Sequence, residues 1–246
     1  MGKTVRLDKF LADAGAGTRS EVKKYIQKGQ IRVNGIPVKR PEIKVEPEKD
    51  LVEREGVPVS AAPEFVYYLL HKPAGCVSAT TDNRDRTVME YVPSGRKGLF
   101  PVGRLDKDTE GLLLITDDGA LAHELLSPKK HVEKTYYARI SGIVTEEDIQ
   151  AMKKGVDIGE EKPTLPARLE ILSVNEAEKT SEIHLTICEG KFHQVKRMME
   201  AVGKKVTYLR RISMGSLTLE ETLLPGTYRE LTAEEVELLK KTAKKP

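Results

Sequence analysis

The chain has 246 residues, enough for one large domain or two smaller ones with a buried core. Two cysteines, without any C-x-x-C or His-rich spacing, exclude a disulfide framework and argue against a structural metal site. No apolar run approaches the roughly 20 residues of a membrane span, and the N-terminus lacks the apolar core of a signal peptide. The sequence therefore predicts a cytoplasmic protein without a membrane partner.

The net charge of +3 conceals an asymmetry along the chain. Residues 1–44 contain eleven Lys or Arg and four Asp or Glu, a net charge of +7, whereas the remaining residues carry a net charge of −4. A basic front segment on a near-neutral body is typical of a polyanion-binding module joined to a second domain.

The sequence pattern of residues 1–45 predicts two short helices and a small β element. Apolar residues recur at helical spacing over residues 6–14. Thr18 and Glu21 form a capping box for a second helix that runs to about Lys28. Asn34-Gly35 then joins two short apolar strands in a hairpin.

Residues 6–35, RLDKFLADAGAGTRSEVKKYIQKGQIRVNG, closely resemble the S4 RNA-binding domain. The resemblance implies that the second helix and the turn after it contact RNA phosphates. The basic residues available for this are Arg19, Lys23, Lys24, Lys28 and Arg32. Such contacts supply affinity and positioning rather than sequence choice. A solvated helix face that is merely charged is the simpler alternative.

Within residues 46–64, residues 56–63 are the part with the least regular sequence pattern. We therefore expect a domain boundary near residue 60. The expected domains are residues 1–60, including the linker, and residues 61–246. In the second domain the uninterrupted apolar run Leu112–Ile115 predicts a strand that is buried on both faces and central to a sheet. Alternation over residues 135–140 predicts another strand, with one tyrosine on each face.

The segment before the central strand, PVGRLDKDTEG at residues 101–111, holds a candidate catalytic carboxylate. Asp106 lies where a rigid scaffold can hold a loop side chain, and Arg104 is close enough to help keep it ionised. On this stretch alone, a turn-forming aspartate is the simpler interpretation of Asp106. We expect that structural role for Asp108, Asp117 and Asp118, the last two in a hairpin turn with Gly119.

Three separated segments stand out together: GRLDKDTEGLLLITDDG at 103–119, EKTYYARI at 133–140 and EGKFHQVKRMMEAVG at 189–203. Behind an S4-like segment, this series resembles the motifs of RNA pseudouridine synthases, and most closely the small-subunit ribosomal pseudouridine synthase A (RsuA) family. The similarity spans nearly the whole chain and includes HKPAG at 71–75. It implies an α+β fold: a small S4 domain, then a catalytic domain with a mixed, mainly antiparallel sheet and a cleft across it.

The resemblance also assigns roles to residues. It implies that Asp106 is the nucleophile, Tyr136 the active-site tyrosine and Lys196 the active-site basic residue, where relatives often carry arginine. Arg104 matches an arginine that helps to hold the flipped-out nucleotide. Because uridine isomerisation involves no redox change and no net group transfer, no cofactor is expected, and no metal.

The remaining residues of the third segment are expected to be mainly structural. Phe192 and Met198 are predicted to lie in the core, and His193 to hydrogen-bond a loop rather than act as a general base. Gln194 and Arg197 are candidates for touching RNA.

The leading hypothesis is isomerisation of a specific uridine in 16S ribosomal RNA, free or in an assembling small subunit, by a monomeric enzyme. A 23S rRNA pseudouridine synthase of the same superfamily is one alternative, and a non-catalytic S4-containing ribosome assembly factor is another. A metal-dependent hydrolase that uses the aspartates of residues 106–118 is a more distant alternative, since no His or Glu ligands accompany them.

Overall fold

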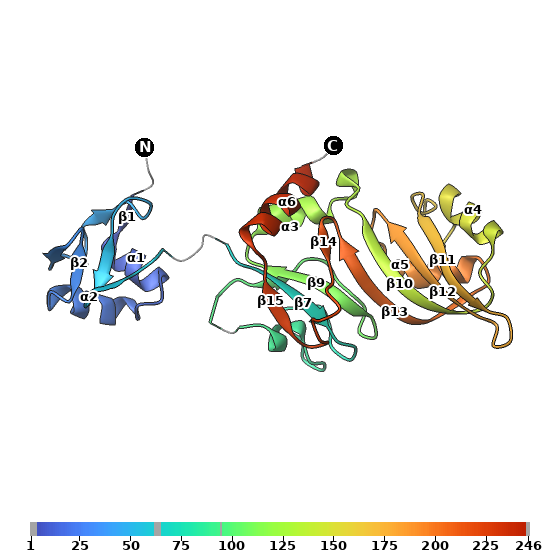
Figure 1. Cartoon of the computed structure of the whole chain (residues 1–246), viewed down its shortest axis with the longest axis horizontal. Coiled ribbons are helices and arrows are strands. Elements are labelled where there is room, and N and C mark those ends of the chain that lie inside the picture. The colour runs from blue at the N-terminus through green and yellow to red at the C-terminus, as the bar shows by residue number, and fades with distance from the viewer. Residues whose placement is uncertain (1–3, 62–64, 94, 245–246) are drawn as a thin grey trace. The chain divides into compact units, whose positions relative to one another are not determined.

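The computed structural model describes residues 4–61, 65–93 and 95–244. The chain forms two compact units, residues 1–64 and residues 65–246 (Figure 1). The boundary expected near residue 60 falls shortly before this division. Among the described residues, no helix combines the length and the apolar character needed to cross a membrane.

The first unit packs two helices against short strands. The helices are α1 (Leu7–Asp13) and α2 (Arg19–Gln27). The strands β2 (Ile31–Val33), β3 (Ile36–Val38), β5 (Val52–Arg54) and β6 (Val57–Pro58) form a sheet in the order β3-β2-β5-β6, and β1 (Val5–Arg6) pairs with β4 (Lys44–Val45).

Local signals of the first unit are confirmed. The Thr18 hydroxyl accepts a hydrogen bond from the Glu21 backbone N–H, and the Glu21 carboxylate accepts one from the Thr18 backbone N–H. The hairpin across Asn34-Gly35 pairs β2 with β3. Since the core of this unit is built by apolar residues at helical and strand spacing, the outer face of α2 is left to its charged side chains.

The second unit is built on one mixed sheet of nine strands. They are β7 (Tyr67–Lys72), β8 (Phe100–Pro101), β9 (Glu110–Thr116), β10 (Lys134–Ser141), β11 (Arg168–Asn175), β12 (Thr180–Ile187), β13 (Lys205–Met214), β14 (Leu217–Thr218) and β15 (Tyr228–Glu230). The main path is β11-β12-β10-β13-β9-β7-β15, while β8 pairs with β9 and β14 with β13. Among the strand pairs of this sheet in the described residues, β9 with β13 alone is parallel, so the predicted mixed, mainly antiparallel sheet is confirmed.

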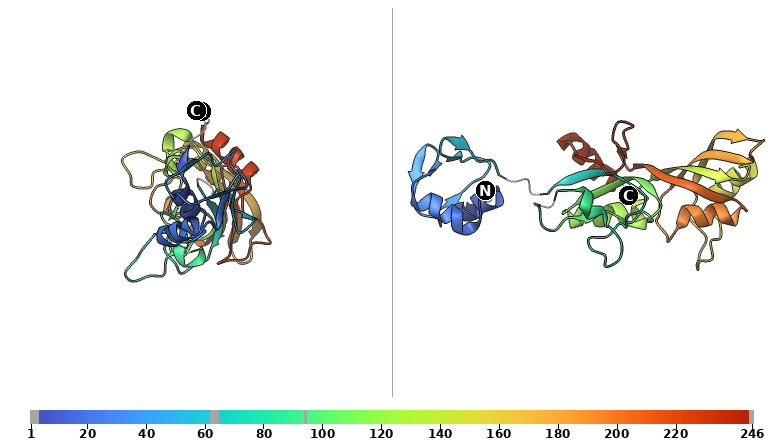
Figure 2. Two further views of the ribbon diagram at one scale, coloured as in Figure 1. Left: turned by 90° about the vertical axis from the view of Figure 1, so that its left-hand side faces the viewer. Right: turned by 90° about the horizontal axis from the view of Figure 1, so that it is seen from below.

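Helices cover this sheet. They are the 3₁₀ turns η1 (Val88–Tyr91) and η2 (Pro128–Lys130), and the α-helices α3 (Gly119–Leu126), α4 (Glu146–Lys154), α5 (Gln194–Ala201) and α6 (Ala233–Lys244). α3 and α6 pack together in the core cluster of β7 and β9, while α4 and α5 belong to the cluster of β10, β11 and β12. The long strands curve past α5, shown in orange in Figure 2.

The central strand β9 is buried on both faces, as its sequence predicts. Leu112 and Leu114 lie in the core cluster with α3 and α6, whereas Leu113 and Ile115 lie in the cluster on the opposite face. This double burial fixes the strand that follows Asp106 and makes it a stiff support for the loop.

The turn after β9 differs from the sequence prediction. Asp118 does not form a hairpin but caps α3, since its carboxylate accepts a hydrogen bond from the Leu121 N–H at 3.0 Å. It also accepts one from the Tyr67 hydroxyl at 2.8 Å. The residues Asp-Asp-Gly suit both a hairpin turn and a helix N-terminus. The apolar face of the following residues, which packs as helix α3, favours the helix.

Candidate active site

The loop that carries Asp106 is pinned by Ser78. The Ser78 hydroxyl donates to the Leu105 carbonyl at 2.9 Å and accepts from the Leu105 N–H at 3.0 Å. Because both backbone groups of the residue before Asp106 are tied to one buried side chain, the position of the carboxylate is defined before any ligand binds.

Lys72 pins the other side of the same loop. It lies at the end of β7, is fully buried, and its ammonium donates to the carbonyls of Thr109 (2.8 Å), Pro73 (3.0 Å) and Lys107 (3.4 Å). Burial lowers the pKa of Lys72. The HKPAG segment at residues 71–75 thus ends a strand and holds the loop of Asp106. A lysine within an apolar strand is the sequence signal for this role.

Asp106 faces Lys196 of helix α5 and His193, the residue just before that helix. Its carboxylate lies 3.2 Å from Lys196 Nζ and 3.6 Å from His193 Nε2. Lys196 also donates to both oxygens of Asp108, at 2.7 and 2.9 Å. The ammonium therefore bridges two carboxylates, and turn formation does not account for the side chain of Asp108.

These contacts set the charge state of the cluster. The hydrogen bond from Lys196 lowers the pKa of Asp108. Burial acts to lower the pKa of Lys196, but hydrogen bonds to Asp108 and Asp106 outweigh it and raise that pKa above its usual value. Lys196 is therefore a fixed positive charge beside Asp106 at neutral pH.

His193 lies beside Asp106, directly before helix α5. Its φ is +49°, a left-handed conformation that is uncommon for residues other than glycine. Phe192 stacks on the His193 ring, with ring centroids 3.7 Å apart. The structural role expected for His193 stays a prediction.

A cavity of about 570 Å³ opens beside Asp106. Tyr136, which is buried on β10, lines it together with Arg104 from the loop. Lys196 lines a neighbouring hollow that shares Asp106 and His193 with the cavity. The structure thus brings Asp106, Tyr136 and Arg104 to one cavity and places Lys196 at its side. Arg104 is exposed, and no ion pair joins it to Asp106, although both residues are described.

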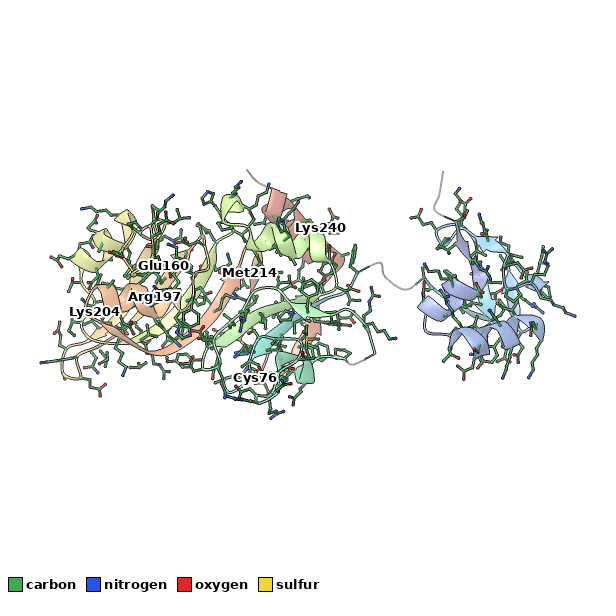
Figure 3. All side chains as sticks on the ribbon, turned by 180° about the vertical axis from the view of Figure 1, so that it is seen from behind. Cys76, Glu160, Arg197, Lys204, Met214 and Lys240 are labelled. Carbon is green, nitrogen blue, oxygen red and sulfur yellow. The ribbon has the colours of Figure 1, made fainter. Side chains whose placement is uncertain are left out.

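Two expectations for the segment around α5 are wrong. Phe192 is 74% exposed rather than in the core; it lines the cavity and stacks on His193. Gln194 is buried and bonds Glu189, so it is not available to RNA. Arg197 pairs with Glu160 (Figure 3) and donates to the Phe192 and Ile158 carbonyls, and its contact with RNA stays a prediction. Met198 lies in the core, as expected.

The basic residues predicted for the first unit share one property: their side chains are exposed. They are Arg19, Lys23, Lys24, Lys28 and Arg32. None of the ion pairs between described residues includes them. These exposed charges are therefore accessible to phosphate groups.

No group of three or more potential metal ligands gathers anywhere in the described part of the chain. The site instead combines the Asp106 carboxylate, the Lys196 ammonium, the His193 imidazole, the Tyr136 ring and an adjoining cavity. Such a set can hold a planar ring beside an ionised nucleophile or base.

Family models match both units of the chain. Residues 66–201 match the family model described as RNA pseudouridylate synthase, and residues 5–52 match the S4 domain. The chain is 48% identical to an uncharacterized RNA pseudouridine synthase of Bacillus subtilis, over 96% of this chain and 98% of the relative. It is 43% identical to ribosomal small subunit pseudouridine synthase A of Vibrio parahaemolyticus, over 95% and 98% of the two chains.

Two further comparisons bear on substrate and fold. The chain is 40% identical to ribosomal large subunit pseudouridine synthase B of Bacillus subtilis, over 97% of this chain and 96% of the relative. It is also similar to a solved pseudouridylate synthase, with a TM-score of 0.66, 39% identity, and coverage of 96% of this chain and 99% of the other.

Proposed function

Because the chain belongs to the RNA pseudouridylate synthase family and is an RNA-directed isomerase, we propose that it converts one specific uridine of 16S ribosomal RNA to pseudouridine. The observation that carries the proposal is the contact of Asp106 with Lys196 at the side of a cavity lined by Tyr136. A carboxylate, its cation and a ring platform meet there.

Asp106 is the residue that acts on the nucleotide. The reaction breaks the bond from N1 of uracil to C1′ of the ribose, turns the ring, and joins C5 to C1′, without redox change. An ionised carboxylate can attack the base, attack the sugar, or abstract a ribose proton. Each route needs the charged form, and the Lys196 ammonium lies 3.2 Å from this carboxylate.

Tyr136 and Arg104 hold the everted nucleotide. Taking a base out of the RNA stack costs a few kcal/mol, and stacking on an aromatic ring returns about 1–3 kcal/mol of that. Tyr136 on β10 offers the ring from inside the cavity, and the exposed Arg104 guanidinium lies on the same cavity for the sugar–phosphate backbone. Neither role requires a cofactor.

The first unit provides affinity for ribosomal RNA. The exposed basic residues of α2, of the turn after it and of β2 form no ion pair with any described residue, and they suit phosphate contacts. We expect the enzyme to act as a cytoplasmic monomer on 16S RNA, either free or in an assembling small subunit.

The choice of 16S over 23S RNA is supported by sequence. The segments RLDKFLADAG at 6–15 and EKPTLPA at 161–167 resemble the small-subunit enzymes. Relatives named for the large subunit match at a similar identity, so 23S RNA is the alternative target. Mapping pseudouridines in the ribosomal RNA of a deletion strain decides between them: loss of a 16S modification is expected, and loss of a 23S modification alone contradicts the assignment.

The catalytic role is tested with purified protein. Wild-type enzyme should release tritium from 5-tritiated uridine in ribosomal RNA, and Asp106→Ala should abolish release while RNA binding persists. Glu176→Ala, at an exposed turn position, is the control and should behave as wild type. Equal tritium release by Asp106→Ala removes Asp106 from the mechanism. Full rescue of a deletion strain by Asp106→Ala would instead favour a binding-only assembly factor.

A further inference from the structure

Two basic side chains lie beneath the cavity beside Asp106. Lys134 is 6% exposed, Arg211 is 3% exposed, and both line the cavity. Lys134 and Tyr136 are two residues apart on β10, so they project from the same face. Arg211 on β13 is the direct strand partner of Tyr136. The three side chains therefore form one cluster at the cavity floor.

Among the residues that the structure describes, neither basic side chain has a carboxylate partner. Lys134 Nζ donates to the Val132 carbonyl at 2.9 Å, and Arg211 Nε donates to the Leu112 carbonyl at 2.8 Å. Burial, with a smaller contribution from the charge of Arg211, lowers the pKa of Lys134 to about 8. Two buried charges of one sign without a counter-charge are unfavourable for the free protein.

The same cavity also collects buried polar atoms that lack partners. Thr109 Oγ1 and Arg211 Nη2 have no hydrogen-bond partner among the described residues, and both residues line the cavity. Buried polar atoms are normally satisfied, so unpartnered ones around a single cavity indicate a ligand that completes them. That ligand must carry hydrogen-bond acceptors for the cations.

We propose that Lys134 and Arg211 form a floor subsite that binds the ring oxygens of the everted pyrimidine and selects uracil over cytosine. This inference rests on the proposed function, since it requires a uridine substrate. Lys134 and Arg211 then determine specificity for the base. They act beside the active-site residues Asp106, Tyr136, Lys196 and Arg104.

The depth of Lys134 and Arg211 in the cavity favours the uracil base, rather than a phosphate group, as the group that binds to them. The Asp106 side chain is 23% exposed and Arg104 is exposed, so these residues lie nearer the mouth than Lys134 and Arg211. An everted base enters ahead of its own phosphate. Uracil offers acceptors at O2 and O4, whereas cytosine carries an amino donor in place of O4, which would meet the cations unfavourably.

The subsite also matches the charge that develops in the reaction. When the N1–C1′ bond breaks, its electron pair stays with uracil, which becomes an anion with charge on O2 and O4. When C5 joins C1′ and the C5 proton is transferred away, N1 gains a proton and the base is neutral again. Fixed cations at the oxygens stabilise the charged stage.

The test compares wild type with Lys134→Met, using single-turnover tritium release and binding of two RNA fragments, one with the mapped uridine and one with cytidine at that position. We expect the tritium-release rate to fall about 100-fold in Lys134→Met. We also expect the preference for the uridine fragment to shrink toward one. Lys134→Arg, which keeps the charge, should recover part of both. The exposed Lys154→Met, on α4, is the charge-loss control and should match wild type.

The outcomes separate the possibilities. A folded Lys134→Met with wild-type rate and wild-type preference for uridine overturns the subsite. Weaker binding of both fragments by the same factor, with a smaller salt dependence, would instead assign Lys134 to a phosphate and also overturn it. Absence of tritium release by the wild type overturns the proposed function itself. A midpoint of thermal unfolding in Lys134→Met at or above that of wild type excludes misfolding as the cause.

Discussion

Lys196 Nζ lies 3.2 Å from Asp106 and joins helix α5 to the loop that precedes the central strand β9. The same ammonium holds Asp108 at 2.7 Å, so one cation organises two carboxylates of the GRLDKD segment. Asp108 is thus one of the two carboxylates that bind Lys196, although its sequence context predicted only a role in a turn.

Removing the Lys196 charge should impair catalysis more than folding. In Lys196→Met the two carboxylates lose their shared cation, so we expect the tritium-release rate to fall about 100- to 1,000-fold. Lys196→Arg, which keeps the charge, should retain most of the activity. An equal loss of rate in Lys196→Arg and Lys196→Met would argue against an electrostatic role.

The ring of Tyr136, rather than its hydroxyl, is expected to carry the stacking energy. Tyr136→Leu should lower kcat/KM about 10- to 100-fold, since stacking contributes about 1–3 kcal/mol, whereas Tyr136→Phe should keep RNA affinity. Tyr137→Leu is the matched control, because Tyr137 projects from the opposite face of β10 near Tyr208 and His184. Equal losses in the two leucine variants would indicate a general effect on the sheet.

Phe192 is an exposed aromatic ring beside the cavity, and we expect it to stack on a nucleotide next to the target. Phe192→Ala should raise the KM for RNA about 10-fold and leave the unfolding midpoint unchanged, since the side chain is 74% exposed. Leu224→Ala, also strongly exposed, should change neither quantity. A lower unfolding midpoint without a change in KM would assign Phe192 a structural role.

Gly111 is required where β9 and β13 pair in parallel. It has φ at +109°, and a Cβ there would lie 2.2 Å from the backbone oxygen of Arg211. Gly111→Ala should therefore lower the free energy of unfolding by about 3–5 kcal/mol or prevent folding, as measured by urea denaturation. Gly119→Ala is the control, since nothing lies within 4 Å of its added Cβ and its φ is not positive. Wild-type stability of Gly111→Ala would contradict this pairing geometry.

Lys134 should destabilise the free enzyme at neutral pH. Its pKa is lowered from 10.5 to about 8, so the folded chain binds this proton more weakly than the unfolded chain. At 1.36 kcal/mol per pKa unit the cost is about 3 kcal/mol below pH 8. Between about pH 8 and 10.5 the unfolded state holds more protons, and the free energy of unfolding rises with pH. The groups that act on Lys134 are Arg211 and the Cys188 thiol.

Lys134→Met should remove this pH dependence and stabilise the protein by about 1–3 kcal/mol at pH 7. Urea denaturation of both proteins at pH 7 and pH 9.5 measures the difference. Loss of stability in Lys134→Met at both pH values would mean that the ammonium holds the fold through its bond to Val132.

Much of the architecture could be predicted from local patterns. The Thr18–Glu21 capping box, the Asn34-Gly35 hairpin and the doubly buried run Leu112–Ile115 are each confirmed, because each is governed by neighbours along the chain or by a continuous apolar surface. The motif series was also sufficient to indicate the family.

The failures share one cause, since burial and pairing of a side chain depend on distant residues. Phe192 has a core-type side chain, yet the left-handed turn at His193 leaves it exposed on the cavity. Gln194 has a polar side chain suited to RNA, yet it is buried and bonds Glu189.

The sequence by itself determined the two-part organisation, the central strand and the carboxylate in front of it, because capping, turn chemistry and apolar periodicity act over a few residues. Only the tertiary structure decided which charges meet. The packing of α5 against the sheet brings Lys196 and His193 to Asp106. The pairing of β10 with β13 brings Lys134 and Arg211 together under the cavity. Electrostatic interactions depend on distance in space, which sheet register and helix packing set and which local sequence does not encode.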